Sequence, residues 1–372
     1  MHVGIITMFY HSSNYGGVLQ SYALIKAMEK LGMDAEQICY NHYSAFSWKK
    51  RLKRRMKQCL SLMKHPSCLR TYLRMNRRQN TVVYASENII KHSSKVYTER
   101  TIMDCVNDYD AFVTGSDQVW HGEWPAYFLT FVPSSKRKIS YAASTGKTKL
   151  TGDDIRFICN CTKDYKAVSV RESDTAVQLQ EAMPDKKVEL VLDPTLLLDK
   201  EDWDTVASDR LLNQPYVFCY FLGNDQRMRS LSSEYAIKHG YTLVTIPHMQ
   251  QKVEINDLHF GDIQVFDAAP QDFLSYIKYA EVIFTDSFHA SVFSQIFRRQ
   301  YYVFGRLEHQ EMNNRIITLT DMFESRPHFI EKINQYRLDY LENLPAIDYE
   351  RCCNKYERMR EKSIDFLRRN LT

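Results

Sequence analysis

An apolar run at 282–285 leads directly into Ser287 and His289, which place a hydroxyl and an imidazole at the predicted start of a helix. The first backbone N–H groups of a helix have no partner within it, and the helix dipole is positive there, so such an end binds phosphate or carboxylate groups. We expect Ser287 to cap the helix and contact an anion, and His289 to transfer a proton near neutral pH. Alternatively, Asp286 or Ser287 is only a cap, and His289 is a structural histidine.

A second candidate is the polar turn between an apolar run at 3–8 and a helical pattern at 18–28. Its residues are Asn14, Tyr15, Gly16 and Gly17. Two glycines at a strand-to-helix turn let the backbone approach a ligand closely. The turn lacks the G-x-G-x-x-G spacing and the P-loop lysine, so it supports neither NAD nor a Walker-type nucleotide. The alternative is a tight turn that binds nothing.

Polar side chains also follow the apolar run at 111–114. They are Ser116, Asp117 and Gln118, with the indole of Trp120 close behind. Hydroxyl groups of a sugar need hydrogen-bond partners, and its C–H face needs an apolar surface, so this combination suits a saccharide. The alternative is that Asp117 caps a helix and Trp120 lies in the core.

Two more apolar runs end in residues that can bind a ligand. The run at 138–142 is followed by Ser144, and the run at 167–170 is followed by Arg171 and Glu172. In parallel α/β sheets, ligands bind beyond the carboxyl ends of the strands. Arg171 is therefore expected either to bind a carboxylate or to pair with its neighbour, and the end of a strand favours the first.

The elements that must position these residues alternate along the whole chain of 372 residues. Strand-like runs and helical patterns resume after a polar stretch near 199–214, with strands at 216–222, 242–247 and 282–285 and helices at 226–239, 270–280 and 290–297. This alternation predicts an α/β fold with parallel sheets, and the length predicts two domains facing a cleft. We place two Rossmann-like domains at 1–212 and 213–347, and a C-terminal helix that packs back on the body at 348–372.

Charge and cysteine content exclude several classes of function. The net charge of +4 is small for this length and does not indicate nucleic acid. The nine cysteines are odd in number and lack paired ligand spacing, which argues against a disulfide framework and a zinc site and favours a reducing, cytoplasmic location. We find no signal peptide and no membrane-spanning run, and we expect no metal and no cofactor.

Basic residues concentrate in one predicted helical insertion near 45–80. No acidic residue occurs from 41 to 86, whereas 49–78 contains twelve Lys or Arg. Apolar residues interspersed over 48–78 suit a helix lying on an anionic membrane surface, as a peripheral contact at the inner face. The alternative is a solvated insertion whose apolar side packs on the protein.

Taken in order, six segments of the chain resemble the polysaccharide pyruvyl transferase family. The segments are Asn14 to Leu24, Gly115 to Trp120, Ile139 to Gly146, Ser169 to Glu172, Leu192 to Thr195, and Thr285 to His289. The resemblance implies a fold of the GT-B glycosyltransferase type, with acceptor and donor on the first and second domains. It also implies that phosphoenolpyruvate is the donor and that the product is a cyclic pyruvate ketal on a sugar diol. One residue departs from the pattern, because Ala290 stands where many relatives have glycine.

The resemblance also suggests roles for individual residues. His289 would transfer protons, Arg171 would hold the donor anion, and Asp117 would bind the acceptor hydroxyls or act as base. Arg315, in a segment similar to a late family element, would add a second cation. The other residues expected to bind substrate are Asn14, Tyr15, Gly16, Gly17, Ser116, Gln118, Ser144 and Ser287.

Two other functions fit the same features. A sugar-nucleotide glycosyltransferase of the GT-B type would use the same architecture, because a fold does not fix the donor. A saccharide- or anion-binding scaffold would retain the same groups without turnover. The sequence leaves open the acceptor sugar, whether that acceptor is lipid-linked, polymeric or free, and the oligomeric state.

Overall fold

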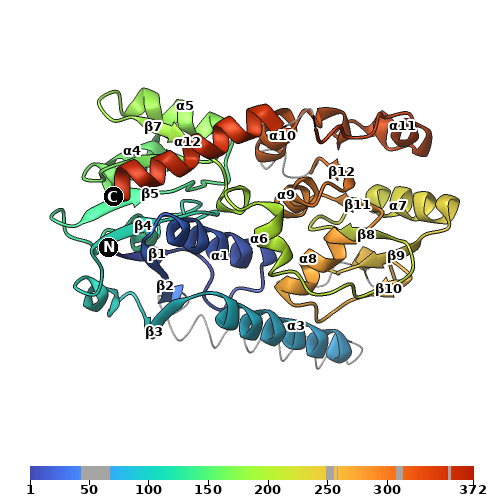
Figure 1. The fold of residues 1–372 in the computed structure, drawn as a ribbon, viewed down its shortest axis with the longest axis horizontal. Helices are drawn as coiled ribbons and strands as arrows, with labels where there is room; N and C mark the ends of the chain where they lie inside the picture. Colours follow the sequence, from blue (N-terminus) through green and yellow to red (C-terminus); the bar gives the residue numbers. More distant parts are fainter. Residues whose placement is uncertain (43–67, 249–254, 258, 307–312, 351–352) are drawn as a thin grey trace.

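The computed structural model describes residues 1–42, 68–248, 255–257, 259–306, 313–350 and 353–372. Two parallel sheets organise these residues, one in each half of the molecule (Figure 1). This confirms the predicted α/β fold with parallel sheets.

The first sheet has the strand order β3-β2-β1-β4-β5. Its strands are β1 (His2–Ile6), β2 (Asp34–Tyr40), β3 (His92–Tyr97), β4 (Ala111–Thr114) and β5 (Arg137–Ser140). A parallel pair, β6 (Val168–Val170) and β7 (Val188–Leu190), continues beyond β5 through bridges at Ile139–Ala167 and Ala143–Val170. The helices of this half are α1 (Tyr15–Lys30), α3 (Cys68–Ile89), α4 (Gly152–Thr162) and α5 (Ser173–Ala182).

The second sheet has the strand order β10-β9-β8-β11-β12-β13. Its strands are β8 (Tyr216–Tyr220), β9 (Thr242–Thr245), β10 (Ile263–Gln264), β11 (Val282–Thr285), β12 (Gln300–Phe304) and β13 (Phe329–Ile330). Its helices are α7 (Gln226–His239), α8 (Pro270–Lys278), α9 (Phe288–Ile296), α10 (Asn314–Met322) and α11 (Leu338–Glu342). The central strands β8 and β11 are buried along their whole length, as expected where helices cover both faces of a parallel sheet.

The two halves share one continuous core. Helix α1 packs against α8, and the Tyr15 ring stacks on Phe273 at 4.7 Å between centroids. The linking helix α6 (Lys200–Asp204) adds Trp203, which is fully buried between α1 and α9 and donates its indole N–H to the Thr195 carbonyl. The domains therefore meet through apolar side chains, and the loops at their strand ends face one another beside that contact.

The last helix, α12 (Cys353–Leu371), returns from the second half and lies across the first (Figure 1). Its Ser363 hydroxyl accepts a hydrogen bond from the Leu192 backbone N–H at 2.9 Å, and the Tyr356 hydroxyl donates to the Leu196 carbonyl at 2.8 Å. These contacts fasten the segment that follows β7, on which Asp193 lies. Among the described helices, none is long and apolar enough to cross a bilayer.

Candidate active site between the domains

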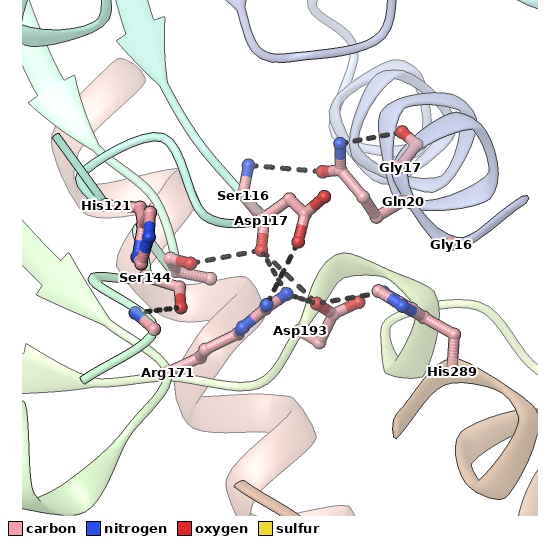
Figure 2. A network of polar contacts seen from close by, with 12 residues as sticks. Gly16, Gly17, Gln20, Ser116, Asp117, His121, Ser144, Arg171, Asp193 and His289 are labelled. Carbon is pink, nitrogen blue, oxygen red and sulfur yellow. Dashed lines mark hydrogen bonds and ion pairs between the residues drawn. The ribbon is translucent and has the colours of Figure 1, made fainter. Parts of the chain in front are cut away.

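Polar side chains from several strand ends meet where the two halves face each other (Figure 2). Asp117 follows β4, Arg171 directly follows β6, and Asp193 lies just beyond β7. From the second half, His289 lies in the first turn of α9. The carboxyl ends of parallel strands meet at one edge of a sheet, so the fold brings these residues together over long sequence separations.

Arg171 is the centre of this network. Its side chain is 2% exposed and pairs with three carboxylates: Asp117 (Nη2 to Oδ1, 3.2 Å), Glu172 (Nε to Oε1, 3.4 Å) and Asp193 through Nη1. Burial alone would lower the pKa of Arg171, but these carboxylates raise it above its usual value. The sequence left open whether Arg171 binds a ligand or pairs with Glu172. In the structure the guanidinium is engaged by protein carboxylates, so we assign it a positioning role.

Asp193 joins Arg171 to the histidine of the opposite domain. Its Oδ2 atom lies 3.7 Å from Nε2 of His289, and its Oδ1 atom accepts hydrogen bonds from the N–H and hydroxyl groups of Thr195. Burial raises the pKa of Asp193, but His289 and Arg171 outweigh that effect and hold it well below its usual range. Asp193 therefore places a carboxylate beside the imidazole of His289. In the sequence, Asp193 belongs to the family segment Leu192 to Thr195, and no individual role was predicted for it.

The glycine turn leaves room for this histidine. A Cβ atom added to Gly16 would lie 2.0 Å from Nδ1 of His289, whereas one added to Gly17 would lie 3.4 Å from Oδ2 of Asp117. Asn14 caps α1 by accepting the Gly16 N–H at 3.1 Å. The turn therefore brings the backbone at Gly16 against the imidazole of His289, whereas the predicted approach of a ligand to the two glycines stays a prediction.

Gln20 ties the glycine turn to the loop that carries Asp117. Its Oε1 atom accepts the Ser116 N–H at 3.2 Å, and its Nε2 atom donates to the Gly17 carbonyl at 2.9 Å (Figure 2). The backbone of Asp117 in this loop is in the left-handed region, with a φ of 65°. No role was predicted for Gln20, because a glutamine in a helical pattern carries no signal of a partner 96 residues away.

The two residues before α9 have different partners. Ser287 is the N-cap, and its hydroxyl accepts the Ala290 N–H at 3.4 Å. Asp286 instead accepts the backbone N–H groups of Leu222 and Gly223 at 2.7 and 2.8 Å, and also pairs with Arg306. Asp286 thus fixes the loop after β8 beside α9, and Ser287 is the capping residue.

Arg315 lies at this helix start, where its guanidinium contacts an aromatic ring. Its guanidinium carbon is 5.6 Å from the centre of the Phe288 ring, and that of Arg171 is 5.2 Å from the same ring. Within the described part of the chain, Arg315 has no hydrogen bond or ion pair, and its buried Nε atom lacks an acceptor. Burial, followed by repulsion from Arg306 and Arg171, lowers its pKa to about 10. A cation in such surroundings is stabilised by any anion that arrives.

The remaining predicted residues have supporting positions. Ser144 donates to Glu172, and the Ser116 hydroxyl donates to Asp193 at 3.2 Å. Gln118 is half-buried, and its amide nitrogen lies 2.4 Å from where a Cβ on Gly146 would be. In the described ranges, no three His, Cys, Asp or Glu side chains are grouped so that they could hold a metal ion.

One expectation needs correction, and one open alternative is decided. Tyr15 does not line the site, because its ring is fully buried in the interface and its hydroxyl donates to the Ala268 carbonyl at 2.9 Å. Trp120 offers no surface to a sugar, since it is 3% exposed and stacks on Phe128 at 5.3 Å. In both cases an aromatic residue beside a polar turn is buried in the core. Whether such a residue faces the core or a ligand depends on tertiary packing.

Comparison with known proteins identifies the family and the fold. The family model described as polysaccharide pyruvyl transferase matches residues 14–307. No curated protein sequence gives a significant match. UDP-GlcNAc 2-epimerase from Methanocaldococcus jannaschii is 12% identical with a TM-score of 0.55, covering 99% of this chain and 100% of that one. The MnaA–UDP co-structure from S. aureus is 12% identical with a TM-score of 0.52, covering 100% and 96%. These similarities show the fold, which is of the GT-B type.

We predict that Asp193→Asn destabilises the protein by about 3–5 kcal/mol at pH 7, because it leaves buried cations underpaired. The folded pKa of Asp193 is depressed, so its contribution is present above the usual carboxyl pKa and is lost as the pH falls through the lower folded value. Denaturant unfolding of both proteins from pH 7 to pH 3 should therefore show their difference shrinking below about pH 4. The exposed pair of Asp365 provides the control, since Asp365→Asn should change stability by about 1 kcal/mol or less. Equal stability of wild type and Asp193→Asn at pH 7 would contradict the assignment.

We also predict that Gly16→Ala displaces the His289 ring, since a Cβ atom cannot lie 2.0 Å from Nδ1. The expected cost is about 1–3 kcal/mol, with altered imidazole nitrogen signals in NMR spectra. Gly17→Ala is the matched control, because its methyl group would make ordinary contacts and should leave both readouts close to wild type. Unchanged His289 signals in Gly16→Ala would show that the two residues do not touch.

Proposed function

Because the chain belongs to the polysaccharide pyruvyl transferase family, we propose that it moves the pyruvyl unit of phosphoenolpyruvate onto two hydroxyl groups of a saccharide. In this reaction one sugar hydroxyl loses its proton as its oxygen bonds to C2 of the donor, and one proton is added to the C3 methylene, so that the two balance. The C2–O bond to phosphate then breaks, the second sugar oxygen bonds to C2, and its proton leaves with the phosphate. The products are a cyclic pyruvate ketal and inorganic phosphate.

The observation that carries the proposal is the unpaired Arg315 at the start of α9. Phosphoenolpyruvate has a phosphate and a carboxylate, so its site must supply a cation and further N–H donors. Arg315 supplies the cation, and the first turn of α9, capped by Ser287, supplies unpaired backbone N–H groups. Asn314 donates a hydrogen bond to Asp174 of α5, which holds the start of α10 against the first domain and keeps Arg315 in place.

His289 is suited to the proton transfer. It lies in the same turn of α9, is 7% exposed, and has an ionised carboxylate 3.7 Å from Nε2. Asp193 places a carboxylate beside this imidazole, and we assign to His289 the delivery of a proton to the methylene carbon and the recovery of one from the acceptor. Asp193 is thus a positioning residue, and Gly16 provides the space that the imidazole occupies.

Asp117 is the carboxylate best placed for the acceptor. Among the three partners of Arg171, its side chain is the most exposed, at 12% against 6% for Glu172 and 1% for Asp193. One oxygen contacts Arg171, while the other faces the glycine turn. Asp117 can therefore accept a hydrogen bond from a sugar hydroxyl and orient it toward the donor.

A sugar-nucleotide glycosyltransferase is the second candidate, and the GT-B fold favours it. The M. jannaschii epimerase has also been solved in complex with UDP-GlcNAc and UDP, and that structure has a TM-score of 0.52 and 13% identity over 99% of this chain and 100% of that one. Calorimetric titration with phosphoenolpyruvate and with UDP-GlcNAc separates the two functions. Binding of the nucleotide sugar without binding of phosphoenolpyruvate would reject pyruvyl transfer.

We predict different kinetic effects for the two key residues in a phosphate-release assay with phosphoenolpyruvate and a panel of saccharides. His289→Gln should lower kcat by about 10²–10⁴-fold, because it removes the proton-transfer group. Arg315→Gln should raise the Kd for phosphoenolpyruvate by about tenfold or more, because it removes a charged hydrogen-bond donor. His239→Gln and Arg298→Gln, at exposed positions on other elements, should behave as wild type. Normal turnover by His289→Gln would remove that residue from catalysis.

A further inference from the structure

The basic stretch that was predicted to contact a membrane is described only at its end. There, in helix α3, the Arg74 guanidinium carbon lies 4.0 Å from the centre of the Phe266 ring, and Arg77 pairs with Asp267 at 2.6 Å. These cations bind protein groups of the second half. The rest of that predicted membrane contact, 48–67, lies outside the described residues.

A buried carboxyl group of the site, that of Glu172, has one oxygen without a partner. Its Oε1 atom accepts hydrogen bonds from the Ser144 hydroxyl and from Nε of Arg171, the latter at 3.4 Å. Its Oε2 atom is buried and has no hydrogen-bond partner among the described residues. The side chain is 6% exposed, so Oε2 is shielded from bulk solvent. A buried polar atom without a hydrogen bond is costly, so this oxygen is expected to carry a proton or to meet a group of a ligand.

This carboxyl group does not serve the helix that it precedes. Glu172 is the N-cap residue of α5, yet its side chain makes no capping hydrogen bond. The side chain is directed instead at Ser144 and Arg171, which follow β5 and β6. Capping therefore does not explain a glutamate at this position.

Glu172 lies close to Arg315, the cation that is proposed to bind the donor. Arg171, which pairs with Glu172, and Arg315 have their guanidinium carbons 5.2 and 5.6 Å from the centre of the same Phe288 ring. The helices that follow the two residues are also joined, because the first residue of α10 donates a hydrogen bond to α5. The unpaired oxygen and the unpaired cation therefore belong to the same part of the site.

The surroundings of Glu172 favour its protonated form. Burial raises its pKa above the usual value, although Arg171, the Ser144 hydroxyl and Arg315 act against this effect. A protonated carboxyl group can donate a hydrogen bond from Oε2 to a phosphate oxygen, whereas an ionised one would repel that oxygen. Glu172 can therefore stand beside an anionic donor.

The proposed reaction needs a second proton carrier. In its first step, His289 delivers a proton to the methylene carbon and recovers one from the first hydroxyl group, so the imidazole ends as it began. In the second step, the departing phosphate gains a proton and the second hydroxyl group loses one. A group that starts protonated can give its proton to the phosphate and take the hydroxyl proton, and it is then restored as well.

We propose that Glu172 is this second proton carrier. Oε2 of the neutral carboxyl group gives its proton to the phosphate oxygen as the C2–O bond breaks, and the electron pair of that bond stays with the phosphate. The carboxylate then takes the proton of the second sugar hydroxyl as the oxygen of that hydroxyl bonds to C2. The inference rests on the proposed function, and it assigns the first step to His289 and the second to Glu172.

A single-turnover experiment in D₂O separates the two steps. With phosphoenolpyruvate and the saccharide that gives most phosphate release, the first step places deuterium on C3, which NMR spectroscopy detects independently of phosphate. Glu172→Gln should still place deuterium on C3 but release phosphate about 10²–10⁴-fold more slowly, because the amide keeps an acceptor for Ser144 and Arg171 but has no proton to give. His289→Gln should lose both signals.

A second buried glutamate provides the matched control. Glu189, in the middle of β7, is also 6% exposed and pairs with Arg369 at 3.3 Å. Glu189→Gln should place deuterium on C3 and release phosphate as the wild type does. If Glu172→Gln does not fold, Glu172→Asp keeps a carboxyl group that is one methylene shorter, and it should show the same pattern of deuterium uptake with slower phosphate release.

Two results would overturn the role of Glu172. One is phosphate release by Glu172→Gln at the wild-type rate. The other is loss of deuterium uptake together with phosphate release, which would show that Glu172 only supports the site. Failure of the proposed function would appear separately, because the wild type would then place no deuterium on C3 with any saccharide of the panel.

Discussion

One buried cation, Arg171, fixes the geometry of the first domain's strand ends. Its guanidinium is surrounded by Asp117, Glu172 and Asp193, which follow β4, β6 and β7 respectively. A charge removed from water must be paired, so none of these loops can move without exposing an unbalanced group. Burial raises the pKa of Glu172, whereas His289 and Arg171 hold that of Asp193 well below its usual range.

The two buried arginines of the site, Arg171 and Arg315, have different surroundings. Arg171 is fully engaged by protein carboxylates. One of them, Asp193, also lies beside the imidazole of His289. Arg315 has no such partners in the part of the chain that the structure describes, and burial together with repulsion from Arg306 and Arg171 lowers its pKa. Arg171 and Arg315 both lie close to α9, because their guanidinium groups lie over the same Phe288 ring. Arg171 thus supports the site, whereas in the proposed function the neighbouring Arg315 binds the ligand.

The sequence predicted the architecture well and the site incompletely. Apolar runs such as 111–114 and 282–285 became β4 and β11, because buried parallel strands are continuously apolar. Polar residues at their ends were recognised from local pattern, and the structure brings Asp117, Arg171 and His289 into one network. The pairing of Arg171 depends on contacts between distant segments, which no local pattern encodes. Tyr15 was misjudged for the same reason, since its partner Ala268 is 253 residues away.

The central claim is that a doubly charged three-carbon donor binds between Arg315 and the start of α9. A crystal structure of the protein with phosphoenolpyruvate, in the absence of an acceptor, tests this most directly. The account predicts phosphate or carboxylate oxygens within hydrogen-bond distance of the Arg315 guanidinium and of the first backbone N–H groups of α9, with the methylene carbon facing His289. Donor density elsewhere, with Arg315 still unpaired, would contradict it.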